Sequence, residues 1–152
     1  MLESKTKKWL WRIVWALVII NIFVVCNHYT NDLKARFPNM DLSRTRWGLA
    51  SWYSETDPYI NKHTANNEVF DDKADTCATW HFPFHEKLIV INVFNGKWTV
   101  CRVNDRGPAK RLKREIDLTH AVFRKISNSK RGLIPVTVIP IDKPKIKKPA
   151  SR

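Results

Sequence analysis

Cysteine is scarce in this sequence, and its few cysteines lack the spacing of a metal site. The chain of 152 residues has three cysteines, Cys26, Cys77 and Cys101, with no Cys-x-x-Cys pair and no His/Cys cluster. We therefore expect no bound metal ion. Cys77 and Cys101 could form one disulfide in an oxidising compartment. The alternative is a pair of buried thiols that pack as small hydrophobic residues.

Acidic residues are also few, with 14 Asp and Glu against 27 Lys and Arg, and the formal net charge is +13. Most of the excess lies in the two ends, residues 1–46 and 143–152, while residues 47–142 are closer to charge balance. A nucleic-acid-binding protein usually concentrates positive charge on its folded domain, so we expect no nucleic-acid partner. Basic ends instead suit an anionic lipid or wall surface.

Small residues are missing where a signal peptidase would need them. Basic residues precede an apolar run at 13–26, which is the pattern of a signal sequence. The residues after this run, from Asn27 to Thr30, offer a poor cleavage site. We therefore favour an uncleaved signal anchor over a cleaved signal peptide or a lipid-modified Cys26. Residues 1–27 would then tether the chain to the inner membrane, facing the periplasm, or direct its export.

Two further segments lack the apolar pattern of a core. Residues 28–46 are mixed and polar, with Pro38 among them, and they predict a linker. Residues 143–152 carry two prolines among lysines and predict a basic disordered tail. The folded part of the chain is therefore expected at residues 47–142.

Within this central part, apolar residues alternate with a period of two, which is typical of β-strands. The Asn95-Gly96 pair is a strong signal for a hairpin turn. One short helix is expected at 119–126, with Asp117 or Thr119 as its cap. Strands are expected at 48–53, 88–94, 97–103 and 134–141, and two prolines place the last one at a sheet edge or mark its ends. The pattern predicts a small closed β-barrel of five or six strands.

Four stretches of the central part occur in an order that matches one known pattern. They are Gly48-Leu-Ala-Ser-Trp-Tyr53, Thr64-Ala-Asn-Asn-Glu-Val-Phe-Asp71, Thr76-Cys-Ala78 with Pro83-Phe84, and Arg102-Val-Asn-Asp-Arg-Gly-Pro108 followed by Ile116-Asp-Leu118. Together they resemble the rare lipoprotein A family over residues 47–141. The resemblance implies a mainly β fold, a six-stranded double-psi β-barrel with one short helix, here preceded by an N-terminal hydrophobic helix.

Members of this family are lytic transglycosylases, so the resemblance also implies an activity. They cut peptidoglycan glycan strands between N-acetylmuramic acid and N-acetylglucosamine, leave a 1,6-anhydro end, and prefer strands without stem peptides. They need no cofactor, and many carry a C-terminal peptidoglycan-binding domain, which we do not expect in this chain. The implied partners are peptidoglycan strands and, through the N-terminal segment, a membrane. Nothing in the sequence indicates an oligomeric state.

The functional positions of the family can be carried over residue by residue. Its catalytic acids match Glu68 and Asp105, whereas its histidine position holds Thr79. His81 lies two residues further on, on the same side of an extended strand, and could partly replace the missing imidazole. The residues expected to support catalysis or to bind substrate are Asn66, Thr79, His81, Asn104, Arg106, Tyr53 and Trp80.

Lytic cleavage needs a carboxyl group that holds its proton near neutral pH. It protonates the leaving oxygen and can then accept the proton of the sugar's own C6 hydroxyl, while a second carboxylate stabilises the oxocarbenium-like transition state. A free Glu has a pKa of about 4.3, so a shift of about two units, or about 2.7 kcal/mol, is required. Loss of the family's histidine favours an alternative, a non-catalytic expansin-like module that binds or loosens the wall.

Overall fold

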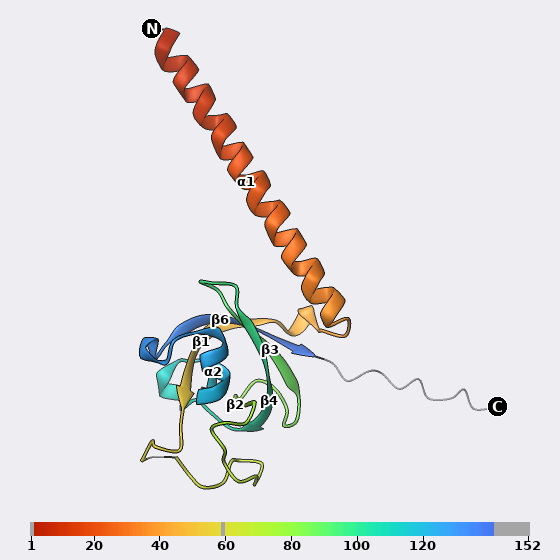
Figure 1. The fold of residues 1–152 in the computed structure, drawn as a ribbon, viewed down its shortest axis with the longest axis vertical. Helices are drawn as coiled ribbons and strands as arrows, with labels where there is room; N and C mark the ends of the chain where they lie inside the picture. The colour runs from red at the N-terminus through yellow and green to blue at the C-terminus, as the bar shows by residue number, and fades with distance from the viewer. Residues whose placement is uncertain (1, 59, 142–152) are drawn as a thin grey trace, which may run out of the picture. The chain divides into compact units, whose positions relative to one another are not determined.

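A computed structural model describes residues 2–58 and 60–141 (Figure 1). The chain divides into two compact units, Met1–Pro38 and Asn39–Arg152, and each is described by itself. The predicted disordered tail at 143–152 lies outside the described residues.

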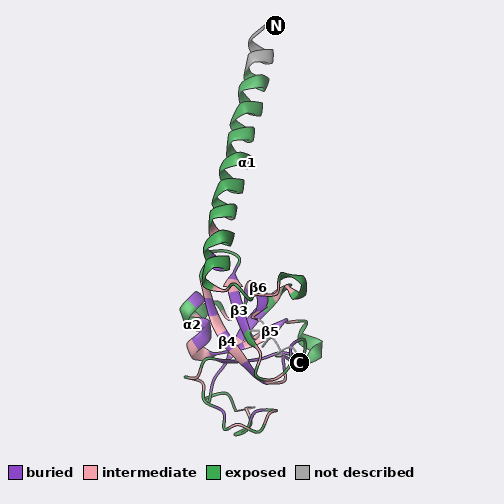
Figure 2. Cartoon of the chain, turned by 90° about the vertical axis from the view of Figure 1, so that its right-hand side faces the viewer, coloured by how far each residue is buried: buried purple, intermediate pink, exposed green. Residues whose placement is uncertain are grey.

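The first unit is one long helix, α1, which spans Leu2–Arg36. The apolar side chains between Trp9 and Val25 are exposed (Figure 2). They cover every side of the helix and do not form one stripe, as the surface helix of a globular protein would. The part from Lys7 to Arg36 is long and apolar enough to cross a membrane, a property that signal sequences share.

The helix does not end with the apolar run. It continues through polar residues to Arg36, because no proline or glycine interrupts it before Pro38. The segment predicted as a linker from residue 28 is therefore helical as far as Arg36. A single turn of 3-10 helix, η1 (Leu42–Arg44), then precedes the first strand.

The second unit is a closed barrel of six strands. They are β1 (Arg46–Tyr53), β2 (Thr76–Ala78), β3 (Lys87–Asn92), β4 (Trp98–Asp105), β5 (Ile116–Thr119) and β6 (Ile134–Ile141). Around the barrel the order is β1-β5-β2-β4-β3-β6. The pairs β1–β5 and β2–β4 are parallel, and the other neighbours are antiparallel. The predicted mainly β, six-stranded barrel is confirmed.

The barrel interior follows from the alternation of apolar residues along the strands. Leu88 and Val90 of β3, Val103 of β4 and Leu118 of β5 are all completely buried. They belong to one core cluster of buried residues, and buried residues occur along the strands of the barrel (Figure 2). β6 pairs with both β1 and β3, so its prolines do not mark a sheet edge and instead lie near the two ends of the strand.

β3 and β4 form the hairpin that the Asn95-Gly96 pair predicted. The strands end at Asn92 and resume at Trp98, so the connecting loop is longer than a two-residue turn. The Gly96 N–H donates to the Asn92 carbonyl at 2.9 Å, and Gly96 has a φ of +69°, where a side chain would be strained.

A disulfide joins Cys77 of β2 to Cys101 of β4, with the two Cα atoms 5.9 Å apart. Both residues are buried, and together with the parallel pairing the crosslink fixes the two strands side by side. Of the two alternatives for these cysteines, the structure therefore has the disulfide. This matters for the site, because β4 ends at Asp105 and β2 leads directly into Thr79.

The short helix α2 spans His120–Ile126 and buries Val122, Phe123 and Ile126 against the barrel. Its N-cap residue, Thr119, makes no side-chain capping bond, since its hydroxyl donates to the Ala74 carbonyl at 2.7 Å. Asp117 does not cap the helix either, because it lies within β5. The capping role expected for these two side chains is therefore wrong.

Candidate active site

Two hollows meet at the last residue of β4. One, which we call the cleft, has a volume of about 370 Å³ and lies between the ends of β1 and β4 and the loop after Asp105. The other, the side hollow, has a volume of about 460 Å³ and is lined mainly by the connection between β1 and β2. Ile60, Asp105 and Arg106 line both. Asp105 therefore stands where an extended ligand could pass from one hollow to the other.

Two backbone donors orient the Asp105 carboxylate. Its Oδ1 accepts the N–H of Ala65 at 2.8 Å and the N–H of Arg106 at 2.7 Å. Among the described residues, none donates a hydrogen bond to Oδ2, which leaves that oxygen for a ligand. Asp105 thus lies in an accessible position between the two hollows.

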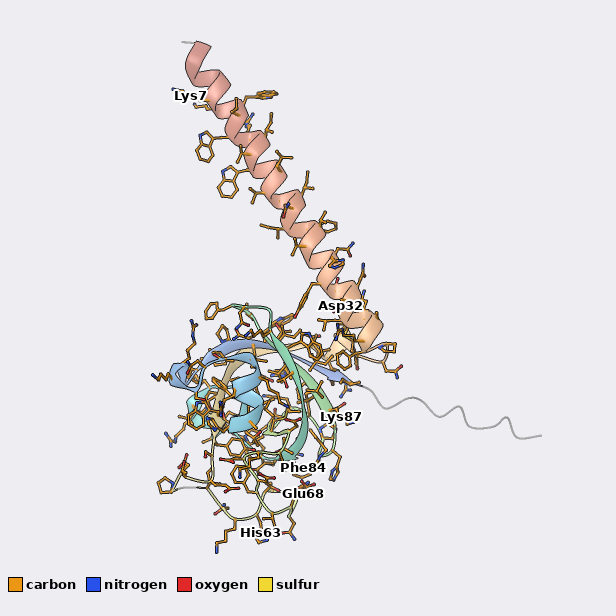
Figure 3. All side chains as sticks on the ribbon, in the orientation of Figure 1. Lys7, Asp32, His63, Glu68, Phe84 and Lys87 are labelled. Carbon is orange, nitrogen blue, oxygen red and sulfur yellow. A yellow bond between two sulfur atoms is a disulfide. The ribbon has the colours of Figure 1, made fainter. Side chains whose placement is uncertain are left out.

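Glu68 has a different environment. It belongs to the β1–β2 connection (Figure 3) and lines neither hollow. Arg102 donates to both of its oxygens, at 2.7 and 2.8 Å, while Asn104 and Asn66 donate at 3.1 and 2.8 Å. These bonds, chiefly those from Arg102, lower the pKa of Glu68 to about 2. Glu68 is therefore a carboxylate at neutral pH and has no proton to give to a leaving group.

Glu68 and its partners instead hold the loop that orients Asp105. The Asn66 N–H donates to the Asn104 carbonyl at 3.2 Å, so the loop is tied to β4 at the residue before Asp105. Ala65, the neighbour of Asn66, is the residue whose N–H reaches Asp105. Asn67 has a φ of +73°, a left-handed conformation that asparagine tolerates better than most residues.

We expect Glu68→Gln and Arg102→Gln to remove the same contribution to the free energy of unfolding, namely the ion pair between these two residues, which is lost in acid. The pKa of Glu68 is about 2 in the folded chain against about 4.5 without its partners, so its contribution is present above pH 4.5 and is lost as the pH falls toward 2. The measurement is the melting temperature of wild type and of both variants between pH 7 and pH 2.

The melting temperatures of the two variants should be lower than that of wild type at pH 7 and should approach it at pH 2. Because Glu68 is partly exposed, the loss should be modest. Glu55→Gln serves as the control, since this exposed carboxylate takes no part in the hydrogen bonds between Glu68 and Arg102. A constant offset between wild type and the variants across the whole pH range would contradict the assignment.

Thr79 and His81 do not enter either hollow. Thr79 is completely buried, and its hydroxyl donates to the Glu115 carbonyl at 3.2 Å. His81 lies near Arg46 and Glu115, with its Nε2 3.8 Å from a Glu115 oxygen. Since β2 ends at Ala78, strand alternation does not extend to these positions. The expectation that His81 stands in for the missing imidazole is therefore not supported by its position.

Thr79→His is expected to destabilise the barrel and not to raise activity. The Thr79 side chain has no exposed surface, so an imidazole there overpacks the core and removes the hydrogen bond to Glu115, at a cost of about 1–3 kcal/mol. Chemical denaturation of wild type and Thr79→His measures this loss, and Thr79→Ser, which keeps the hydroxyl, should cost less. A Thr79→His variant with unchanged stability and raised activity would refute this expectation.

The remaining predicted residues surround the cleft in different ways. Arg106 donates to the Thr79 and Phe82 carbonyls at 2.8 and 2.9 Å, so it fastens the loop after Asp105. Trp80 is half-exposed, and its Nε1 donates to the Pro108 carbonyl at 2.7 Å. Trp80 thus stands beside the same loop without lining the cleft.

Tyr53 lines the cleft, and its ring stacks on Phe70 with the centroids 4.9 Å apart. Its hydroxyl is buried and has no hydrogen-bond partner in the described part of the chain. Burial, and then the charges of Asp105 and Asp117, raise the pKa of this hydroxyl. The Tyr53 hydroxyl is therefore a free donor close to two carboxylates.

Asp117 is the cleft residue that sequence reasoning missed. Ser51 donates to its Oδ1 at 2.6 Å, and Arg114 donates to its Oδ2 at 2.9 Å. Burial is the main cause that raises the pKa of Asp117, and the charge of Asp105 adds to it. A Cβ placed on Gly107 would lie 3.9 Å from Asp117 Oδ2, so this carboxyl lies against the loop that follows Asp105.

A signal for Asp117 was present in the sequence. It stands between Ile116 and Leu118 in a four-residue strand, where alternation turns it away from the core that its neighbours fill. Its interpretation as a helix cap hid that signal. The site therefore contains two carboxyls in one cleft, and burial raises the pKa of one of them, Asp117.

One group of acids satisfies the distance requirement of a metal site. Oxygens of Glu55, Asp71 and Asp72 lie within 4.8 Å of one another. Asp72 already accepts hydrogen bonds from the Ser54 hydroxyl and the Glu55 N–H, and the group lies outside both hollows. Exposed acids often gather in this way without an ion, and we assign none to it.

The strand order and the groove at the end of β4 define a double-psi β-barrel domain. The profile of the family described as "Lytic transglycolase" matches residues 45–138. The chain therefore belongs to this family, as the four sequence stretches indicated.

Curated relatives agree with this assignment. The endolytic peptidoglycan transglycosylase RlpA of Vibrio cholerae is 38% identical over 110 residues, which are 71% of this chain and 41% of that protein. The protein of the same name from Pseudomonas aeruginosa is 37% identical over 120 residues, 78% of this chain and 34% of its own length. The chain thus spans about a third of the length of the relatives it matches.

Solved structures share the fold at low sequence identity. The Streptomyces papain inhibitor SPI is 20% identical with a TM-score of 0.51, over 64% of this chain and 94% of that chain. An expansin from Clavibacter michiganensis is 19% identical with a TM-score of 0.50, over 66% and 52% respectively. At these identities the likeness concerns the fold alone.

Proposed function

We propose that this protein is a peptidoglycan lytic transglycosylase. It cuts glycan strands between N-acetylmuramic acid and N-acetylglucosamine, forms 1,6-anhydro ends, and acts on peptide-free strands. The observation that carries the proposal is the position of Asp105, held by two backbone donors where two hollows meet and sharing the cleft with Asp117. The names of the curated relatives support the same activity.

The two carboxyls divide the proton transfers of the reaction. Asp117, whose burial raises its pKa, donates its proton to the glycosidic oxygen as the bond from that oxygen to the anomeric carbon breaks. Asp105 stabilises the positive charge at the anomeric carbon and accepts the C6 hydroxyl proton as that oxygen bonds to the carbon. The nucleophile belongs to the substrate, so no water needs to be positioned. Passing the proton from Asp105 back to Asp117 restores the site.

Glu68 has a positioning role in this proposal. Its clamp with Arg102 and Asn104 holds the loop whose backbone N–H orients Asp105. The loss of activity in Glu68→Gln should therefore be matched by that in Arg102→Gln, because both variants release the same loop.

The decisive experiment is a digestion of peptide-free peptidoglycan strands by the full chain in a neutral detergent. Mass spectrometry of the products should find 1,6-anhydro-N-acetylmuramic acid ends. Products with reducing ends at the cleavage site would indicate hydrolysis. The absence of any cleavage product would refute the proposal.

A second function is favoured by one observation. The position of the family's histidine holds a buried threonine, Thr79, and His81 faces Arg46 and Glu115 instead of the cleft. A chain without that imidazole could act as a wall-binding or wall-loosening module without turnover. Tight binding of peptide-free strands with no release of anhydro ends would support this reading.

We also propose that α1 is an uncleaved anchor in the inner membrane and that the barrel faces the periplasm. The basis is the run of exposed apolar side chains on α1, preceded by basic residues and followed by a poor cleavage site. N-terminal sequencing of the protein isolated from cell envelopes should find residues 9–26 retained. A mature N-terminus downstream of Asn27, or a lipid on Cys26, would contradict the proposal.

A further inference from the structure

A second region of the barrel surface carries positive charge that the active site does not use. A hollow of about 530 Å³ lies between the β3–β4 hairpin, the end of α2 and the turn η3 (Ser129–Arg131). Lys97, Arg124 and Arg131 line it, and no Asp or Glu is among its lining residues. We call it the cationic hollow.

The three cations of this hollow have no partner in the described part of the chain. The side chains of Lys97, Arg124 and Arg131 form no ion pair or hydrogen bond within residues 2–58 and 60–141. Two other cations of the barrel are paired, Arg102 with Glu68 and Arg114 with Asp117. Three like charges around one cavity repel one another, and an anion there would remove that repulsion.

Two side-chain amides fix the wall of the hollow. The Asn92 side chain is 2% exposed, and its Nδ2 donates to the Ile126 carbonyl at 3.0 Å. Asn95 donates to the same carbonyl at 3.1 Å. The hairpin is thereby fastened to the end of α2, and the cavity between them does not depend on the exposed cations for its shape.

The cationic hollow lies next to the cleft. Trp52 lines the cleft, and its Nε1 donates to the carbonyl of Ser129, which lines the cationic hollow. The Trp52 ring also contacts the His120 ring, with centroids 4.6 Å apart, and His120 Nε2 lies 2.8 Å from the Ser129 hydroxyl. One tryptophan and its direct partners therefore separate the two cavities.

We propose that the cationic hollow binds a carboxylate of the same peptidoglycan strand whose scissile bond lies at Asp105. This inference rests on the proposed function. Each muramic acid carries a lactyl carboxyl, which is a free anion on a bare strand and an amide where a stem peptide is attached. Stem peptides bring carboxylates of their own. Arginine pairs with such groups through two parallel hydrogen bonds, and a concave cavity suits one discrete anion better than a flat bilayer surface.

The test is a binding measurement with chemically matched ligands. The parent is the full chain with Asp105→Asn, in neutral detergent, so that strands stay intact. It is compared with a variant that adds Arg124→Gln and Arg131→Gln, and with a control that adds Lys130→Gln. Lys130 lies between lining residues of the same turn but does not line the hollow. The ligands are peptide-free strands, the same strands with their carboxylates converted to methylamides, and peptide-bearing strands.

The double substitution should weaken binding of peptide-free strands by at least about tenfold, as expected for lost charge-assisted hydrogen bonds, and leave binding of amidated strands unchanged. Lys130→Gln should match the parent. Loss on peptide-free but not peptide-bearing strands identifies the lactyl carboxylate, and loss on peptide-bearing strands alone identifies the stem peptide.

An equal loss on native and amidated peptide-free strands, or no loss on any of the three ligands, would overturn the inference. So would an effect of Lys130→Gln as large as that of the double substitution. The readout is affinity, so a chain that binds strands without cutting them would refute the proposed function and leave this inference standing. A wild type that cuts amidated strands as well as native ones, together with a parent that binds both equally, would refute the inference alone.

Discussion

Replacing Asp105 with asparagine is expected to abolish the release of 1,6-anhydro ends while leaving the barrel folded. Asparagine keeps an oxygen that can accept the N–H groups of Ala65 and Arg106, so the loops around it should stay in place. It cannot accept the C6 hydroxyl proton or carry negative charge beside the anomeric carbon. Proton transfer by a positioned side chain contributes about 10²–10⁴-fold to rate, and we expect a loss in that range.

The measurement is the initial rate of anhydro-end formation on peptide-free strands, with the melting temperature as a check on folding. Asp75→Asn is the matched control, because this carboxylate is exposed, pairs with Lys125 and lies outside both hollows. Wild-type activity that survived Asp105→Asn unchanged would remove Asp105 from the mechanism.

Asp117→Asn is expected to slow the reaction by at least about 10²-fold and to change the shape of its pH dependence. An acid catalyst works only below its pKa, so the wild-type rate should fall as the pH rises through the pKa of Asp117, which burial raises. The residual rate of the variant should lack that alkaline decline, because an amide does not titrate. The pH–rate profile at saturating substrate measures both effects.

Arg114→Gln separates the acid role of Asp117 from a merely structural one. The positive charge of Arg114 favours the ionised form of Asp117, so its removal should raise the pKa further and shift the alkaline decline to higher pH. A structural role would lower the rate equally at every pH. The same alkaline decline in wild type and Asp117→Asn would show that another group supplies the proton.

The fold was predictable from the sequence because its signals are local. Alternation of apolar residues identified the long strands, Asn95-Gly96 identified the hairpin, and the order of four stretches identified the family. The sequence singled out Asp105 for the same reason, since it stands in one of those stretches, and its catalytic role stays a prediction. Strand ends shifted by a few residues because hydrogen bonding with neighbouring strands sets them.

The charge states of the site were not predictable, because they depend on residues far apart in the chain. Glu68 owes its low pKa to Arg102, which lies 34 residues away in the sequence. No local sequence pattern predicts that ion pair. Asp117 owes its raised pKa to burial, which exists only once β5 is paired with β1 and β2. Tertiary structure thus shifts the pKa values of these two acids in opposite directions.

The closed strand order has a consequence for how this domain can meet other molecules. Each of the six strands has a neighbour on both sides, so none of them offers a free edge to an incoming strand. The barrel domain therefore cannot recruit a partner by adding a strand to its sheet, and it cannot aggregate edge to edge. Any partner, whether glycan or protein, has to be recognised by side chains and loop backbone, and a mutation in those surfaces can change partner choice without touching the barrel's hydrogen bonding.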